Sequence, residues 1–241
     1  MDLILTMAGK YSRFAETGYN IPKYLLPFGD RSILSEILNQ FRQQKHPGSS
    51  PPRQFGFRVH LVANKSDERF MGHVRRIMSA HGINHDSLIL IDDTTGQAET
   101  ALKAIEIINP PGPVLFHNID TILYGRDLIE IEQALQRCNG YIDVFRSHNH
   151  SYSYVVADDL GKVELISEKV LVSDLATSGL YGFYTSRYFK IFYESGMMYI
   201  SEIYQKMIED GMDIRTGPVH DEKDTLVLGS PEDYFKISET L

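Results

Sequence analysis

The sequence predicts an α/β fold in a single domain, with a mixed, mostly parallel β-sheet flanked by helices. Short apolar runs alternate with segments of helical spacing through the first half of the chain, a pattern typical of parallel strands joined by helices. From Tyr141 onward, strands of alternating polarity predominate. The length of 241 residues suits one large domain or two small ones, and no segment is long enough to be a domain linker.

Apolar strands and amphipathic helices alternate in the first half. Leu3–Met7 is an apolar run that stops at Ala8 and Gly9, as expected of a buried first strand. Ser32 can cap a helix at Ile33–Phe41, and the polar segment 45–52 that follows is an expected loop. The next expected elements are strands at Phe57–Ala63, Ser87–Ile91 and Val114–His117, and helices at about Asp67–His81 and at Gln97–Ile108.

Strands dominate the next segment, and a helix closes the chain. The last helix begins at Ser230, which can cap it, with Pro231 in the first turn and Glu232 and Asp233 against the helix dipole. The expected strands are Tyr141–Arg146, Tyr152–Ala157, Lys162–Ile166, Gly179–Tyr184, and segments near Asp213–Thr216 and Thr225–Leu228. Two further helices are expected at Ser186–Tyr193 and Ile200–Asp210.

Composition narrows the classes of partner. The formal net charge is −8, so the chain has no basic footprint for a nucleic-acid backbone, and we expect no nucleic-acid partner. Cys138 is the single cysteine, which excludes an intrachain disulfide framework and fits a reducing compartment. No run approaches the roughly 20 apolar residues that span a bilayer, and the N-terminus does not resemble a signal peptide. We therefore expect a cytoplasmic protein without a membrane partner.

The loop after the first strand is the first candidate site, because ligands of open α/β sheets bind beyond the carboxyl ends of the strands. Gly9 follows the strand directly, where backbone amides can approach a phosphate. The same loop carries Lys10, Arg13 and Lys23. Amide dipoles and cations together can neutralise the charge of a nucleoside triphosphate, and an ordinary basic surface loop is the alternative interpretation.

The order of residues in this loop resembles a family signature. Met7–Phe14, followed by Pro22–Pro27, resembles the glycine-rich loop and the Pro-Lys-x-Leu motif of the sugar-phosphate nucleotidylyltransferases. The resemblance implies a Rossmann-like sheet of the nucleotide-diphospho-sugar transferase type. It also implies that the nucleotide contacts the loop residues Ala8, Gly9, Lys10, Tyr11 and Ser12. Tyr11 stands where the family usually has a second glycine, which changes the course of the loop over the triphosphate.

Two later segments are similar to motifs that face the nucleotide in that family. Thr95–Leu102 looks like its Gly-x-Ala segment, so Gly96 and Gln97 are expected to face the base, to which an amide offers both donor and acceptor. Asn118-Ile119-Asp120 resembles its strand-end Asp motif. A carboxylate there would hold Mg²⁺ against the α-phosphate, because this ion takes one or two carboxylates plus phosphate oxygens.

The second half resembles the acceptor-binding part of the family. Lys162–Lys169 looks like the Glu-Lys motif, in which Glu168 would touch substrate hydroxyls and Lys169 would meet the acceptor phosphate. An exposed Glu-Lys pair is also common on ordinary strands. Ser178–Phe183 resembles the Asn-x-Gly-Ile-Tyr-x-Phe strand, with Ser178 in place of Asn and Gly179 beside it as a second acceptor contact.

The C-terminal motif departs from the family at a metal position. Val227–Asp233 resembles Asp-x-Gly-Thr-Pro-Glu-Asp, whose first Asp supplies the second metal ligand in many members. That position is Val227 here. Either Asp120 is the one direct carboxylate, or a nearby acid replaces the lost ligand, with Asp224 preferred to Asp221 because it lies closer along the expected strand.

The resemblance implies an NTP and a phosphorylated small-molecule acceptor as substrates. A sugar 1-phosphate would attack the α-phosphorus of the NTP, giving an NDP-sugar for polysaccharide biosynthesis and pyrophosphate. Arg13, Lys23 and Asp120 would carry the catalysis, and Mg²⁺ would be the cofactor. Residues from 1 to about 125 would form the nucleotide-binding half of the domain, and residues from about 126 to 241 the acceptor-binding half. A homo-oligomer is compatible with the sequence.

Other functions stay open at this point. A cytidylyltransferase acting on a phosphorylated non-sugar such as phosphocholine would be favoured by an aromatic cage, for which Tyr181, Phe183 and Tyr184 are candidates. A catalytically silent, nucleotide-binding regulatory homologue would explain Tyr11 and Val227. A glycosyltransferase would need an Asp-x-Asp metal motif, and the chain offers Asn118-x-Asp120.

Overall fold

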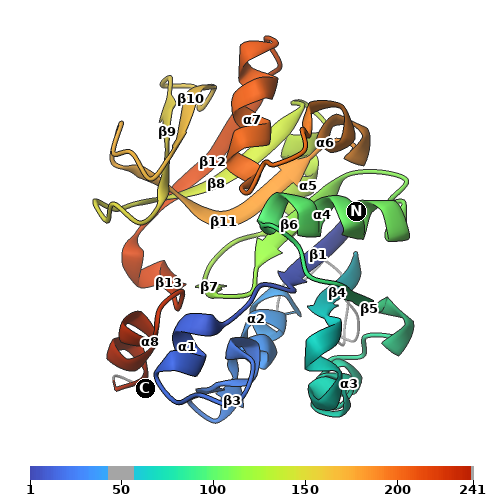
Figure 1. The fold of residues 1–241 in the computed structure, drawn as a ribbon. Coiled ribbons are helices and arrows are strands. Elements are labelled where there is room, and N and C mark those ends of the chain that lie inside the picture. Colours follow the sequence, from blue (N-terminus) through green and yellow to red (C-terminus); the bar gives the residue numbers. More distant parts are fainter. Residues whose placement is uncertain (43–56, 240–241) are drawn as a thin grey trace, which may run out of the picture.

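One mixed β-sheet organises the described part of the chain, residues 1–42 and 57–239 of a computed structural model (Figure 1). The expected loop at 45–52 lies outside these residues. Neighbouring strands of the first half are parallel and follow the order β6-β1-β4-β5. They are β1 (Asp2–Met7), β4 (Arg58–Asn64), β5 (Leu88–Ile91) and β6 (Val114–Asn118).

Strands of the second half extend the same sheet. The long strand β11 (Leu175–Phe183) pairs antiparallel with β6 and thereby joins the two halves of the chain. It also pairs with β8 and β9, while β10 pairs with β9 and β12 pairs in parallel with β8. These strands are β8 (Gly140–Arg146), β9 (Ser153–Ala157), β10 (Val163–Glu168) and β12 (Ile214–His220). The predicted sheet, mixed and flanked by helices, is confirmed.

Helices cover both faces of the sheet because β1 presents apolar side chains to both. Leu3, Leu5 and Met7 pack into one apolar cluster, and Ile4 packs into the other. The first cluster includes residues of α2 (Ile33–Arg42), α3 (Met71–Ala80) and α5 (Leu128–Leu135). The second includes residues of α4 (Gln97–Ile108), α6 (Ser186–Phe192) and α7 (Ile200–Glu209). None of the helices in the described ranges combines the length and apolar character needed to cross a membrane.

The C-terminal segment returns to the N-terminal loop, where Figure 1 shows α8 (Pro231–Ser238) next to α1 (Ser12–Glu16). The ring of Tyr234 lies edge-on to those of Phe14 and Tyr19, with centroids 6.2 and 5.8 Å away. Before α8, the short strand β13 (Thr225–Val227) pairs with β7 (Thr121–Leu123), which follows the end of β6. A small hairpin joins β2 (Pro27–Phe28) to β3 (Arg31–Ser32).

Several elements differ from the expectations. The loop after β1 contains α1 and a 3₁₀ turn at Lys23–Leu25, both too short to show a period in the sequence. The expected helix at 67–81 begins as a 3₁₀ segment, Lys65–Phe70, and continues as α3. Helix α5 was not expected, although Asp127 caps it by accepting hydrogen bonds from the Ile129 and Glu130 amides.

Candidate active site

A cleft of about 400 Å³ lies at the carboxyl ends of β1 and β6. Its lining comes from the loops after β1, β5 and β6 and from the residue before α7, as expected of an open α/β sheet. The lining residues are Thr6, Gly9, Lys10, Lys23, Thr94, Thr95, Gly96, Gln97, Thr100, Asn118, Ile119, Asp120 and Tyr199. Five predicted site residues besides the metal candidate Asp120 are therefore gathered in one cleft: Gly9, Lys10, Lys23, Gly96 and Gln97.

An ion pair between Lys23 and Asp120 forms the charged centre of the cleft. Lys23 Nζ lies 2.6 Å from Asp120 Oδ2, and the two side chains are 18% and 23% exposed. Lys23 opens the 3₁₀ turn after the first loop, and Asp120 lies in the turn between β6 and β7. Burial opposes ionisation of Asp120, but the charge and hydrogen bond of Lys23 outweigh it and lower the pKa of that carboxyl. The Asp120 carboxyl is therefore ionised near neutral pH.

Two cations, Lys10 and Arg13, follow Gly9 after β1. A Cβ atom at Gly9 would meet nothing within 4 Å, so its backbone is open to a ligand. Lys10 Nζ lies 2.7 Å from Asp93 Oδ2, and both side chains are well exposed. Arg13 is exposed, and its guanidinium has no ion pair within the described ranges. These cations can be redirected to an anionic ligand at small cost, because exposed ion pairs contribute little.

Tyr11 is turned away from this cleft. Its hydroxyl donates a hydrogen bond to Asp67 Oδ1 at 3.3 Å, and Tyr24 donates to Oδ2 of the same carboxylate at 3.0 Å. Tyr11 and Ser12 line a neighbouring cavity of about 330 Å³, together with Ala8 and Asp67. The side chain at the family's glycine position therefore leaves the cleft side of the loop open.

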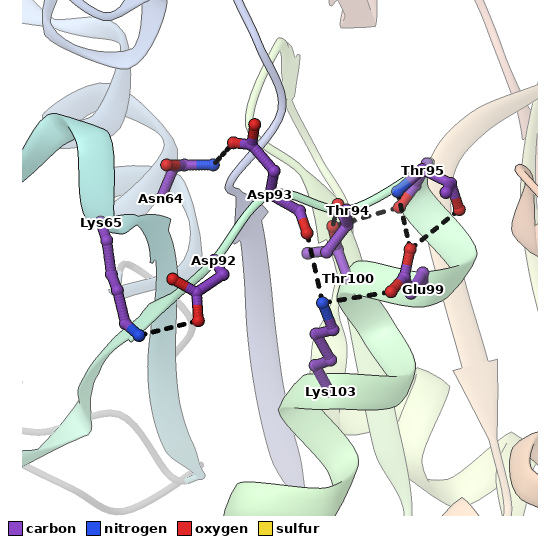
Figure 2. Close-up of polar contacts among 10 residues, drawn as sticks. Asn64, Lys65, Asp92, Asp93, Thr94, Thr95, Glu99, Thr100 and Lys103 are labelled. Atoms are coloured by element: carbon purple, nitrogen blue, oxygen red, sulfur yellow. Dashed lines mark hydrogen bonds and ion pairs between the residues drawn. The ribbon is translucent and has the colours of Figure 1, made fainter.

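The loop between β5 and α4 forms the opposite wall (Figure 2). In Figure 2, Glu99 accepts hydrogen bonds from the backbone and hydroxyl of Thr95, at 2.7 and 2.8 Å, and Lys103 reaches the Asp93 carbonyl. Gly96 lies against the segment before α7, since a Cβ there would be 2.5 Å from the Met198 carbonyl oxygen. A glycine is required here by close packing.

Gln97 connects three parts of the site. Its Nε2 donates to Asn118 Oδ1, and its Oε1 accepts a hydrogen bond from the Ile200 amide at 3.3 Å. Both ends of the amide are thus engaged by β6 and α7. In this arrangement Gln97 orients the end of β6, and the neighbouring Thr94 and Thr95 also line the cleft.

The Glu-Lys motif lies at the end of β10, close to Tyr199. Glu168 accepts hydrogen bonds from the hydroxyls of Ser153 and Ser201, the latter at 2.8 Å. Lys169 has a left-handed backbone, with φ at 55°, and donates to Tyr199 Oη at 2.8 Å. That hydrogen bond raises the pKa of Lys169, against opposition from burial and from the positive charge of Arg13. Arg13 and Lys169 are therefore within electrostatic reach of each other.

No protein-family model matches this sequence, and no curated protein sequence matches it. Similar solved structures include a nucleoside-diphosphate-sugar pyrophosphorylase from Vibrio cholerae RC9, with a TM-score of 0.78 at 22% identity over 98% of this chain and 99% of that one. UDP-glucose pyrophosphorylase complexed with UDP-glucose has a TM-score of 0.74 at 13% identity, over 99% and 97% of the two chains. The inositol-1-phosphate CTP transferase from T. maritima has a TM-score of 0.68 at 13% identity, over 99% and 94%.

The chain has the nucleotide-diphospho-sugar transferase fold. This is the fold that the N-terminal motifs imply, so the resemblance is confirmed at the level of the fold.

Ser178 and Gly179 have different places in this nucleotide-diphospho-sugar transferase fold. Ser178 is 2% exposed, and its hydroxyl accepts a hydrogen bond from the Leu180 amide at 3.3 Å. Gly179 has φ at 87°, and a Cβ there would lie 2.7 Å from Asn118 Nδ2. Gly179 therefore allows Asn118 to pack against β11, and Ser178 is turned inward.

The structure does not bring Asp224 to Asp120. Val227 pairs with Thr121, next to Asp120, whereas the Asp224 carbonyl accepts from the Tyr124 amide at the other end of this short ladder. Asp221 is paired with Lys223 Nζ at 3.8 Å. Across the described ranges, no three His, Cys, Asp or Glu residues form a metal-binding group. Of the predicted metal residues, Asp120 lines the cleft, and one carboxylate there would suit a Mg²⁺ ion that also takes phosphate oxygens of a substrate.

The lining residues that were not predicted as site residues include Asn118 and Tyr199. Asn118 is the last residue of β6, and its position at a strand end inside the Asn118-Ile119-Asp120 motif was a usable signal. Tyr199 precedes α7 and joins the cleft through its hydrogen bond with Lys169. No local pattern marks Tyr199, because its partner is 30 positions away.

Proposed function

We propose that this chain is a nucleotidylyltransferase that joins an NTP and a sugar 1-phosphate to give an NDP-sugar and pyrophosphate. The observation that carries the proposal is the Lys23–Asp120 pair in a cleft that also contains Gly9 and Lys10. Lys169 bonds to Tyr199, which lines the same cleft, and Glu168 Oε1 lies 3.9 Å from Lys169 Nζ. The similar solved structures support the same reaction class, because they include two NDP-sugar pyrophosphorylases.

The chemistry requires positioning and charge neutralisation. The attacking phosphate oxygen is already an anion, so no general base is needed. The negative charge on the oxygens of the α-phosphate has to be neutralised. In the proposal, Lys23 contacts both the α-phosphate and the acceptor phosphate, and Arg13 contacts the departing pyrophosphate. Lys169 binds the phosphate of the acceptor, and Glu168 accepts hydrogen bonds from the hydroxyls of the acceptor's sugar. Asp120 would hold Mg²⁺, which supplies further neutralisation of phosphate charge when bound.

The test is pyrophosphate release from a matrix of nucleoside triphosphates and phosphorylated acceptors, with Mg²⁺ and with EDTA. Lys23→Met and Asp120→Asn should each lower kcat by roughly 10²-fold or more, the usual cost of removing one preorganised charge contact. Lys65→Met is the matched control, because Lys65 pairs with Asp92 on the surface and does not line the cleft. Near-parental turnover in both cleft variants would contradict the assignment.

A phosphorylated non-sugar is the second candidate acceptor, favoured by the likeness to the inositol-1-phosphate CTP transferase. The acceptor matrix therefore includes inositol 1-phosphate and phosphocholine, each with CTP. An aromatic cage for a choline group finds no support, because Tyr181 is 4% and Phe183 0% exposed and both pack with Tyr204 in the core. Nucleotide binding without turnover on any acceptor would favour a silent regulatory homologue.

A further inference from the structure

Asp67 is a buried carboxylate outside every motif that resembles the family. It lies in the 3₁₀ segment after β4 and is 2% exposed. Each of its oxygens accepts one tyrosine hydroxyl, from Tyr11 at 3.3 Å and from Tyr24 at 3.0 Å. A buried carboxylate is costly unless it is hydrogen-bonded, so this residue and its two partners form one unit.

The two tyrosines come from the two segments that carry the predicted cations, the loop after β1 and the 3₁₀ turn that begins at Lys23. Tyr11 follows Lys10 and precedes Arg13 by two positions, and Tyr24 follows Lys23. Tyr24 is 1% exposed, so its hydroxyl has no solvent to replace Asp67. Through these bonds, a single carboxylate ties the loop after β1 to the turn that begins at Lys23.

Asn64, which caps the 3₁₀ segment containing Asp67, also contacts the loop after β1. Its Nδ2 lies 3.4 Å from the Ala8 carbonyl oxygen and 2.9 Å from Asp93 Oδ1, a contact drawn in Figure 2. Asp93 in turn pairs with Lys10. Residues 64–67 therefore reach the loop after β1 at Ala8, at Tyr11 and, through Asp93, at Lys10.

We propose that Asp67 is a positioning residue, which uses Tyr11 and Tyr24 to hold the two cation-bearing loops in the arrangement that receives a nucleoside triphosphate. This inference rests on the proposed function for its ligand. It explains the tyrosine at the glycine position, because a glycine there could not be held by Asp67. The loop gains an anchor in place of the conformational freedom of glycine.

The experiment compares the parent with Tyr11→Phe, Tyr24→Phe and Asp67→Asn in the full chain. Asp67→Asn removes the negative charge and leaves one oxygen acceptor in place of two, so the hold on the two tyrosines is weakened. Tyr204→Phe is the matched control, because it removes another buried tyrosine hydroxyl, bonded to the Tyr141 and Gly182 carbonyls. Tyr11→Phe should disturb folding least, because it keeps the packing of the ring.

Two readouts separate positioning from general stability. Hydrogen exchange of the amides at 8–13 and 23–26 should be faster in all three loop variants and unchanged in Tyr204→Phe. Calorimetry with Mg²⁺ then measures the Kd of whichever of ATP, CTP, GTP, UTP and dTTP binds the parent most tightly. We expect Tyr11→Phe and Asp67→Asn to raise this Kd by about tenfold, which corresponds to the loss of one net hydrogen bond. The Kd of Tyr204→Phe should not change.

The outcomes distinguish this inference from the proposed function. Unchanged exchange and a Kd within twofold of the parent in Tyr11→Phe and Asp67→Asn overturn the inference, even if the parent releases pyrophosphate. An equal loss of affinity in Tyr204→Phe also overturns it, because the effect would then be general destabilisation. A parent that binds none of the five triphosphates overturns both.

Discussion

His117 is a fully buried histidine one residue before Asn118, so it joins the interior of the sheet to the cleft. Its Nε2 lies 2.8 Å from the Thr121 carbonyl oxygen, and its ring is edge-on to Phe41. Burial lowers the pKa of His117 to about 4, although the hydrogen bond to Thr121 acts in the opposite direction. The folded chain therefore holds this imidazole neutral.

Acidification should destabilise the fold through this residue. An unfolded histidine takes up its proton near its ordinary pKa of 6.5, whereas folded His117 resists protonation down to about pH 4. The unfolded state binds more protons between these values, so stability falls as the pH falls from 6.5 to 4, by about 3 kcal/mol at most. Full stability from this group is present above pH 6.5.

Urea unfolding at a series of pH values checks this sign. His117→Gln should flatten the curve between pH 6.5 and 4, because a glutamine amide can still donate to Thr121 and does not titrate. The free energy of unfolding of the variant should still fall slightly with falling pH, because burial also lowers the pKa values of His81 and His220. Parallel curves for parent and His117→Gln would contradict the assignment.

At the scale of the secondary-structure elements, Arg126 connects the end of β7 with β8 and β13. Its Nε lies 3.1 Å from Asp143 Oδ2 on β8, and both side chains are almost completely buried. Its Nη1 donates to the Tyr124 carbonyl at 3.0 Å and to that of Asp224, and its Nη2 donates to Thr225 Oγ1. These contacts place β13 beside β7, and thereby Val227 beside Asp120.

Arg126→Met should be strongly destabilising. The change leaves Asp143 buried without its charged partner, at a cost of roughly 3–5 kcal/mol in the free energy of unfolding. The double variant Arg126→Met/Asp143→Leu removes both charges and should recover a large part of that loss. Urea denaturation of the two single variants and the double variant measures the coupling. Additive effects would show that the two side chains do not act as a pair.

At the scale of the whole molecule, the two halves of the chain share one sheet. Strand β11 pairs with β6 through residues Leu180–Phe183, and β13 pairs with β7. Tyr234 Oη also donates to the Pro27 carbonyl at 2.8 Å, so the last helix holds the first loop. The first half of the chain therefore lacks a complete sheet edge and part of its core without the second half.

The full chain should unfold in a single cooperative transition. Calorimetry should give equal calorimetric and van't Hoff enthalpies. A fragment covering residues 1–125 should remain unfolded, because it exposes the edge of β6 and the apolar face that α5 and α8 cover. Dispersed amide signals in the NMR spectrum of that fragment would show that the halves are independent domains.

Several parts of the fold and site follow from local patterns. The apolar run of β1 and the periodicity of α2 and α4 are local signals of burial, and they predicted those elements correctly. Parallel strands place their carboxyl ends at one edge, so Lys23 and Asp120 could be expected in the same cleft before the structure was known. Helix α5 has a capping Asp127 and regular apolar spacing, and was nevertheless missed.

The chain by itself determined the fold class and the strand-end loops that form the cleft, because burial and turn formation act over a few neighbouring residues. Only the tertiary structure decided which side chains meet. Tyr11 and Asp67 are 56 positions apart, and Lys23 and Asp120 are 97 apart. The inward turn of Tyr11, the engagement of Gln97 by Asn118 and Ile200, and the separation of Asp224 from Asp120 all depend on such distant partners. Hydrogen bonds and ion pairs of this kind leave no period in the sequence, because sheet register and packing bring the partners together.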